Sequence, residues 1–139
     1  MNYVAVGARG LWKCLLIIWA GPNTFVALLI AVANCATGGR LRLRRGALES
    51  FGGVVAKGIR RFPTGPQTAG VTLGHMIFGQ TARGLEAVTN HERVHVKQYE
   101  RLGPFFLPTY FFLSARAWWR GQDPYMDNPL EIEAYKVKG

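Results

Sequence analysis

The most extended pattern in the sequence is an apolar stretch, Leu11–Ala36, in which Lys13 is the only charged residue. A helix of about 20 apolar residues is long enough to cross a lipid bilayer. Gly21, Pro22 and Asn23 interrupt the stretch, so the pattern predicts either one kinked membrane helix or a re-entrant hairpin in which Pro22 opens the second helix. A cleaved signal peptide is the alternative interpretation, because basic residues precede the apolar core.

We interpret residues 1–38 as a retained membrane anchor and residues 39–139 as the domain that follows it. The domain opens with Arg40–Arg44, where charged and apolar residues alternate as in a half-exposed strand with solvated, membrane-facing arginines. Gly46 can turn the chain, and Ala47–Phe51 can return as a second strand. The pattern therefore predicts a β-hairpin directly after the anchor.

A third alternating segment, Val71–Phe78, predicts a strand that carries His75. It follows Phe62–Gly70, which is rich in Pro, Gly and Thr and is predicted to be a loop. Together with the hairpin, this strand predicts a short antiparallel sheet. We expect His75 to be packed and hydrogen-bonded to the backbone; the alternatives are a further metal ligand or a group that polarises a substrate.

Candidate chemistry enters with the five-residue segment HERVH, which contains His91, Glu92 and His95. Residues four apart lie one turn above each other on the same face of a helix, so the imidazoles of His91 and His95 can bind one cation. Glu92 then lies beside the metal, where its carboxylate can take a proton from a metal-bound water. The motif predicts a helix that holds a catalytic metal ion.

Thr89 or Asn90 is expected to cap this helix, and Gly103 with Pro104 is expected to end it. Gln98 lies on the same helix and can bond the free ring nitrogen of a ligand histidine. Basic residues repeat every four positions along the helix, either as a solvated face or as contacts to anionic lipid headgroups: Arg93, Lys97 and Arg101.

The second apolar segment, Leu102–Trp119, is rich in Phe, Tyr and Trp. Pro104 and Pro108 break its beginning and Arg116 stands near its end, so it is a poor independent membrane span. Two interpretations remain for a helix near 105–119. It is either an interfacial or re-entrant helix with tryptophans at headgroup level, or the core helix that covers the sheet. Aromatic content alone does not separate the two.

The C-terminal tail offers a third ligand in Glu131, near the start of a short helix that Asn128 and Pro129 can open. In a capping box, Glu131 would reach back to a backbone N–H and bind no metal. As a ligand, Glu131 would complete a His₂Glu site for Zn²⁺ with an open fourth position for water. Ligation is favoured because two histidines facing one site need an anionic ligand, and few other carboxylates lie downstream.

The net charge of the chain predicts the kind of partner that it binds. The 139 residues include 17 Lys and Arg against 8 Asp and Glu, a formal net charge of +9. Such a chain suits nucleic acid or an anionic membrane; we expect the membrane and no nucleic acid, because the basic residues flank apolar segments. The positive-inside rule places the C-terminal domain in the cytoplasm, since basic residues gather after the first apolar stretch: Arg40, Arg42, Arg44, Arg45, Lys57, Arg60 and Arg61.

These motifs resemble the gluzincin class of zinc metallopeptidases, in which a helical HExxH is completed by a Glu on a later helix. The tail segment EIEA resembles the E-x-E-A segment of membrane-embedded zinc endopeptidases. The resemblance implies a zincin-like domain with His91, His95 and Glu131 as Zn²⁺ ligands and Glu92 as general base. The chain departs from the family at Tyr135, where such enzymes have an Asp that orients a ligand histidine.

Two segments, HERVHVKQYERLGPFFLP and DNPLEIEAY, also resemble small bacterial membrane proteins. This resemblance implies a bacterial inner-membrane location, but it brings no established activity with it. In an active enzyme, a peptide substrate is expected along Val71–Phe78, with Tyr99, Tyr135 or His75 as oxyanion or supporting groups. The competing hypothesis is an accessory subunit of a larger bacterial membrane complex, whose zinc site is structural or vestigial. The intact Glu92 favours the enzyme.

Overall fold

The computed structural model describes residues 3–62 and 67–137, and it has the expected α+β class. Its strands are β1 (Arg40–Arg44), β2 (Ala47–Phe51), β3 (Gly70–Leu73) and β4 (Met76–Gly79). Its helices are α1 (Tyr3–Trp19), α2 (Gly21–Ala36), α3 (Gly53–Arg60), α4 (Ala82–Leu102), α5 (Phe106–Trp119) and α6 (Pro129–Tyr135). A 3₁₀ turn, Gly103–Phe105, joins α4 to α5.

The four strands form one mixed sheet in the order β1-β2-β4-β3. The predicted hairpin is confirmed at both strands, and Arg45 (φ 48°) and Gly46 (φ 79°) form its two-residue turn in the left-handed region. The prediction of an antiparallel sheet is wrong at the centre, where β2 and β4 are parallel. The connection that contains α3 brings the chain back before β4, and this crossover makes the parallel pair possible.

The single strand predicted at Val71–Phe78 is also wrong, because this segment is a hairpin. Leu73 pairs with Met76, and Gly74 (φ 59°) and His75 form the turn between β3 and β4. The alternation of side chains continues across the turn, which hides it in the sequence pattern. Of the loop predicted before this hairpin, residues 63–66 lie outside the described residues, and Gly70 already belongs to β3.

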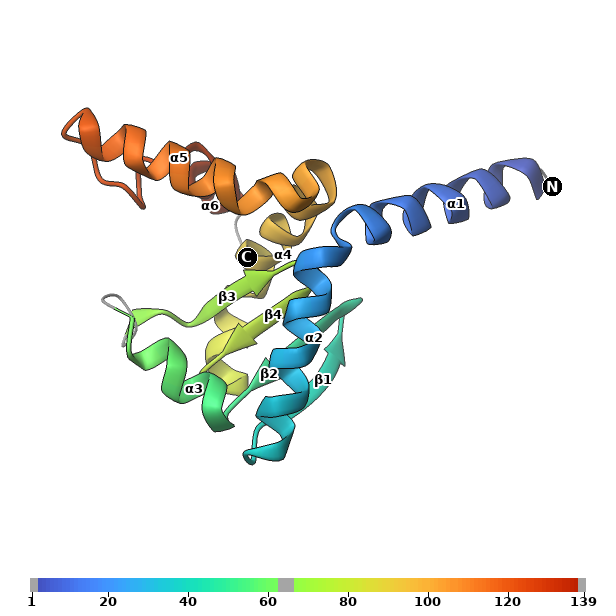
Figure 1. The fold of residues 1–139 in the computed structure, drawn as a ribbon, viewed down its shortest axis with the longest axis horizontal. Coiled ribbons are helices and arrows are strands. Elements are labelled where there is room, and N and C mark those ends of the chain that lie inside the picture. The colour runs from blue at the N-terminus through green and yellow to red at the C-terminus, as the bar shows by residue number, and fades with distance from the viewer. Residues whose placement is uncertain (1–2, 63–66, 138–139) are drawn as a thin grey trace.

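Helices cover both faces of the sheet, with α2 and α3 on one face and α4 on the other (Figure 1). Alternation along β4 serves both layers. Met76 and Phe78 pack with Ala27 and Ala31 of α2 and with residues of α3, whereas Ile77 packs with Leu85 of α4. Helix α4, which carries the HERVH motif, is therefore packed against one face of the sheet.

Helix α4 starts earlier than predicted. Its N-cap is Thr81, whose hydroxyl accepts a hydrogen bond from the Gly84 N–H. Thr89 lies inside the helix and donates its hydroxyl to the Leu85 carbonyl, so neither Thr89 nor Asn90 is the cap. The predicted end is confirmed, because Gly103 adopts a φ of 55° directly after Leu102. The motif thus lies in the middle of a long helix, where the backbone is fully hydrogen-bonded.

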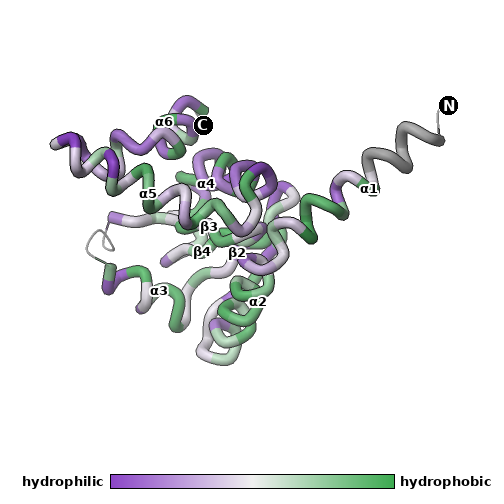
Figure 2. The backbone as a smooth tube through the Cα atoms, turned by 45° about the horizontal axis from the view of Figure 1, so that its top comes forward, coloured by the Kyte–Doolittle hydropathy of each residue, from purple (hydrophilic) through white to green (hydrophobic). Residues whose placement is uncertain are grey.

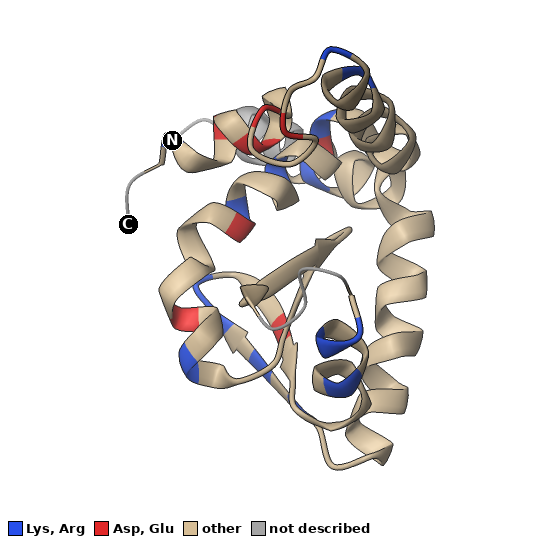
Figure 3. Cartoon of the chain, turned by 90° about the vertical axis from the view of Figure 1, so that its left-hand side faces the viewer, with Lys and Arg blue, Asp and Glu red and all other residues tan. Residues whose placement is uncertain are grey.

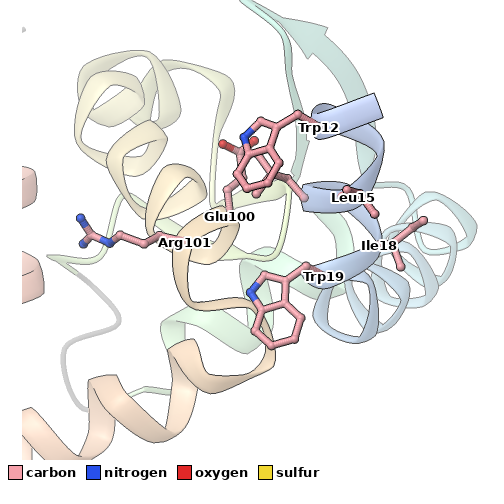
Figure 4. A pocket seen from close by; sticks show the side chains of 7 residues that line it. Trp12, Leu15, Ile18, Trp19, Glu100 and Arg101 are labelled. Atoms are coloured by element: carbon pink, nitrogen blue, oxygen red, sulfur yellow. The ribbon is translucent and has the colours of Figure 1, made fainter. Parts of the chain in front are cut away.

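The first apolar stretch forms two helices, and Pro22 lies in the first turn of α2 as predicted. No single helix in the described part of the chain is both long and apolar enough to cross a membrane; residues 10–19 and α2 meet that test only as a pair, bent by 72°. Helix α1 points away from the sheet (Figure 1). Between α1 and α4 lies an apolar groove of about 600 Å³, into which Trp12 and Trp19 face (Figure 4).

Helix α2 packs its small residues inward and its large apolar residues outward. Ala27 and Ala31 are buried, whereas Phe25, Leu29 and Val32 are 63%, 56% and 70% exposed. Figure 2 shows that apolar residues make up most of α2, and Figure 3 shows that the helix has no charged residue. The outer face of α2 is therefore unsuited to water over its whole length.

Helix α5 does not cover the sheet, so the core-helix interpretation is wrong. Only Phe106 and Ala117 are buried along α5, and the helix extends away from the body (Figure 1). Pro108 lies in the first turn of α5, where its missing N–H breaks no helical hydrogen bond, so it does not interrupt the helix. The outer residues of α5 and the turn before it are strongly exposed: Phe105, Phe111, Phe112, Trp118 and Trp119.

The arginines of β1 correct a further prediction, because Arg42 is not simply solvated. Its guanidinium contacts the buried Glu49 (Nε to Oε2, 2.6 Å) and Glu86 of α4 (Nη1 to Oε1, 3.3 Å). The hydrogen bond with Glu49 raises the pKa of Arg42. Leu41 and Leu43 point the other way and are 46% and 73% exposed. The strand therefore turns its charged face to α4 and its apolar face outward.

Candidate metal centre

The side chains of His91, His95 and Glu131 converge at the contact between α4 and α6. The two Nε2 atoms are 3.2 Å apart, because the histidines lie one turn apart on the same face of α4. Glu131 Oε2 lies 3.1 Å from His91 Nε2, and Glu131 Oε1 lies 3.5 Å from His95 Nε2. One ligand atom from each residue lies within 4.8 Å of the other two, so these three side chains could hold a metal ion.

The spacing of the donor atoms fits zinc. Zinc bonds of roughly 2.0–2.1 Å at tetrahedral angles place two ligand atoms roughly 3.3 Å apart, close to the observed separations. Glu131 Oε2 is buried and has no hydrogen-bond partner among the described residues. A cation would satisfy a buried carboxylate whose two oxygens each lie near an imidazole. The donor set, two imidazoles and one carboxylate, is also of the kind that zinc prefers.

Gln98 fixes which nitrogen of His95 faces the centre. The Gln98 amide donates from Nε2 to the Leu130 carbonyl (3.0 Å) and to Glu133 Oε2 (2.9 Å). Its Oε1 therefore faces His95 Nδ1 at 2.9 Å and accepts a hydrogen bond from it. With its proton on Nδ1, His95 presents the lone pair of Nε2 to the cluster. The sequence-based expectation that Gln98 bonds a ligand nitrogen agrees with this geometry.

The capping alternative for Glu131 can be tested directly against the hydrogen bonds at the start of α6. Asn128 is the N-cap, and its side chain accepts from the Leu130 N–H. The Asn128 N–H, which a capping box would give to Glu131, donates instead to the Tyr125 carbonyl. The Glu131 carboxylate turns to the histidines and accepts a 2.6 Å hydrogen bond from the Tyr110 hydroxyl. Glu131 is thus free of the capping role.

The electrostatics of the cluster favour a charged carboxylate. Burial works to raise the pKa of Glu131, but the close polar contacts with the imidazoles of His91 and His95 outweigh it and hold the pKa at about 2. Burial works to lower the pKa of His95, yet the hydrogen bond and charge of Glu131 raise it overall. Burial raises the pKa of Tyr110, as does its bond to Glu131. The Glu131 carboxylate is therefore charged, and the polar side chains around it stabilise that charge.

Glu92 is buried between α4 and β3. Its Oε2 accepts a 2.7 Å hydrogen bond from the Thr72 hydroxyl, and the backbone at Gly70 passes so close that a Cβ there would crowd the Glu92 side chain. Burial raises the pKa of Glu92, although the charges of His95 and His91 oppose this. The carboxylate is therefore held in place and has an increased affinity for a proton.

The remaining candidates divide into one neighbour of the cluster and two residues placed elsewhere. The Tyr135 ring packs on the His91 ring with centroids 4.5 Å apart, so it supports His91 by contact at the position where the family has an Asp. The Tyr99 hydroxyl donates to the Thr72 carbonyl (3.4 Å). The His75 ring contacts the Thr24 hydroxyl (3.0 Å) and Glu100 (3.4 Å), away from the cluster.

Sequence reasoning missed Tyr110 and Thr72, which bond Glu131 and Glu92 respectively. Both hydrogen bonds join residues about 20 positions apart in the sequence, so no local sequence pattern predicts them. A weak signal existed for Tyr110, as the only hydroxyl-bearing aromatic residue in the segment Phe105–Trp119. Comparison with protein-family models, curated proteins and solved structures finds no match to this chain.

Proposed function

We propose that this protein is a membrane-associated, zinc-dependent metallopeptidase. The observation that carries the proposal is the convergence of His91, His95 and Glu131, with the buried carboxylate of Glu92 beside them. Glu92 separates a hydrolytic centre from a purely structural one, because a structural zinc site needs no extra acid. The resemblance to gluzincins assigns the same roles to the same four residues.

Each residue has a defined part in hydrolysis. A zinc ion held by His91, His95 and Glu131 would supply Lewis-acid activation of a water molecule and of the substrate carbonyl. Glu92 would accept the proton of the attacking water and deliver it to the leaving amine, and burial, which raises its pKa, increases its affinity for that proton. Thr72 holds the Glu92 carboxylate in place at 2.7 Å.

Strand β3 supports a peptide as the substrate. It is an outer strand of the sheet, and in the described part of the chain it pairs only with β4. Its residues Gly70 and Thr72 lie directly against Glu92. An extended peptide paired with the free edge of β3 would therefore run past the general base.

Membrane association is supported by the outer surfaces of α2 and α5. Large apolar side chains such as Leu29 and Phe112 are more than half exposed, and an aqueous surface does not tolerate such patches well. The net charge of +9 adds attraction to anionic headgroups. We propose the bacterial inner membrane as the location, with the C-terminal domain on the cytoplasmic side, as the positive-inside rule favours.

A second candidate is an accessory subunit of a larger bacterial membrane complex. The observation that favours it is the limited access to the centre: the side chains of His91, His95 and Glu131 are only 15%, 8% and 3% exposed. The apolar outer surfaces would then contact partner proteins. In that case the zinc site would bind metal without turning over a substrate.

The test of the proposed site is the zinc content of the purified protein and of two ligand variants, measured by elemental mass spectrometry. We expect about one zinc per chain, in keeping with a single three-residue site, and its loss in His95→Ala and Glu131→Ala. Glu86→Ala is the matched control, because Glu86 is an exposed glutamate of α4 that pairs with Arg42. If the intact protein takes up no zinc even when zinc is supplied, the proposal of a zinc enzyme is wrong. The accessory subunit would then be the better explanation.

A further inference from the structure

The two oxygens of the Glu131 carboxylate have different surroundings. Oε1 accepts a 2.6 Å hydrogen bond from the Tyr110 hydroxyl. Oε2 is buried without a hydrogen-bond partner in the described residues and lies 3.1 Å from His91 Nε2. Both oxygens lie near an imidazole, since Oε1 is 3.5 Å from His95 Nε2, but of the two only Oε1 accepts a hydrogen bond from Tyr110.

The position of Tyr110 is fixed from two sides. The Asn128 side chain donates to the Tyr110 carbonyl (3.1 Å) and to the Ser114 hydroxyl (2.8 Å), which ties α5 to the start of α6. The Tyr110 ring packs in the cluster that contains Phe106 and Leu130. Because the same contacts hold Asn128 and Tyr110 together, the hydroxyl meets Glu131 in a defined geometry.

We propose that Tyr110 is a positioning residue that makes Glu131 a ligand through Oε2 alone. This inference rests on the proposed metal site. A carboxylate can bind a cation through one oxygen or through both, and binding through both would take up an additional coordination position. The hydrogen bond from Tyr110 takes up one of the two lone pairs of Oε1 and withdraws charge from this oxygen, which makes Oε1 the weaker donor to a cation. In this way Tyr110 favours binding through Oε2 and leaves a coordination position for water and substrate.

No other described tyrosine fits this role. The Tyr135 hydroxyl contacts the Tyr125 hydroxyl (3.2 Å), and Tyr99 donates to a backbone carbonyl of β3. Tyr125 therefore offers a matched control, because its hydroxyl contacts the Tyr135 hydroxyl and not a ligand side chain. Replacing either Tyr110 or Tyr125 by Phe removes one hydroxyl and leaves the ring.

The experiment compares the intact protein with Tyr110→Phe and Tyr125→Phe after loading with zinc or cobalt(II). We expect zinc affinity to fall about 10- to 100-fold in Tyr110→Phe, the usual effect of removing a partner of a ligand, and to stay unchanged in Tyr125→Phe. The visible absorption of the cobalt(II) form should weaken in Tyr110→Phe, because its coordination number rises. Loss of packing alone would not produce that spectral change.

X-ray absorption of the zinc-loaded intact protein gives a measurement that does not depend on a variant folding. Four ligand atoms at about 2.0–2.1 Å would support a one-oxygen Glu131, and five or more would overturn it. Equal cobalt spectra and equal zinc affinities for Tyr110→Phe and the intact protein would also overturn the role of Tyr110, while leaving the proposed function in place. An intact protein that binds no zinc would overturn both.

Discussion

Helices α4 and α2 lie on opposite faces of the same sheet, and they depart from the ordinary pattern of a globular protein in opposite ways. Helix α4 buries polar side chains, among them Glu92, His95 and Gln98, whereas α2 exposes Phe25 and Leu29. Burying a polar group is costly unless it has a partner, and each of these three has one. Exposing a large apolar surface is costly in water but not in lipid.

The comparison separates two kinds of information in one fold. The polar side chains of α4 identify a place where chemistry can occur, because evolution gains nothing in stability from a buried acid beside two histidines. The outer face of α2 supports the proposed contact with lipid. Neither helix alone supports the proposed membrane-associated enzyme; the proposal rests on the two together.

The largest effect is expected from a change on α4 that leaves its metal ligands intact. Glu92→Gln should retain zinc but lose about 10²- to 10⁴-fold in peptide hydrolysis, the usual contribution of a general base. Hydrolysis of a labelled peptide library, normalised to zinc content, measures this. The Glu86→Ala control should keep full activity, and equal activity of Glu92→Gln would remove Glu92 from the mechanism.

An intermediate effect is expected from the two faces of α2. Ala27 is fully buried against the sheet, so Ala27→Leu should lower the free energy of unfolding by about 1–3 kcal/mol through overpacking. Leu29→Ala on the outer face should leave unfolding nearly unchanged. It should instead weaken binding to anionic vesicles roughly threefold to tenfold, a part of the roughly 1.5–3 kcal/mol that a Leu side chain gains on leaving water.

Denaturant unfolding and vesicle sedimentation separate these two outcomes. If Leu29→Ala lowers the unfolding free energy as much as Ala27→Leu does, the outer face of α2 packs against protein, and the contrast between the helices disappears. Unchanged vesicle binding would point to the same conclusion. A protein partner would then replace lipid as the cover of α2.

The smallest effect is the pH dependence of the centre. Because the pKa of His95 is raised above 6.5, protons compete with zinc already above that pH, and zinc affinity should fall by up to about tenfold per pH unit as the pH drops through the raised value. The stability of the metal-free protein should have the opposite dependence on pH. The contribution of His95 to its stability is complete below pH 6.5 and is lost as the pH rises through the raised pKa.

Zinc titrations with a competing chelator and unfolding curves of the metal-free protein, both between pH 5 and pH 9, measure the two slopes. The carboxylate of Glu131, with a pKa of about 2, stays charged over this range and adds no slope of its own. Parallel slopes for the two quantities would contradict the assignment of the titration to His95.

Features that depend on neighbouring residues could be predicted from the sequence. The hairpin of β1 and β2 was predictable because alternation and Gly46 agree, and the three converging residues were predictable because helix periodicity brings His91 and His95 together. The capping box competed for Glu131, and only the hydrogen bond from the Asn128 N–H to Tyr125 decides against it. That contact depends on how the preceding loop folds.

The parts that could not be predicted depend on tertiary contacts or on missing local signals. The start of α4 was missed because threonines at positions 81 and 89 are both acceptable N-caps, and only the hydrogen bond from the Gly84 N–H to the Thr81 hydroxyl distinguishes them. The turn at Gly74 was missed because side-chain alternation continues through it. The ion pair of Arg42 with Glu49 is a cross-strand contact, and an alternating strand does not reveal which of its faces is inward.

The first half of α5 also has a consequence for how this chain can vary in length. Tyr110 turns inward to Glu131, and the next two residues, Phe111 and Phe112, turn outward. Inserting or deleting one residue between Phe106 and Tyr110 would rotate everything after it by about 100° and turn the Tyr110 hydroxyl away. A deletion would bring Phe111 to Glu131, and an insertion would bring Thr109 there. The polar loop 121–127 has no such constraint. Related sequences should therefore keep a constant spacing along α5 and differ in length only beyond it.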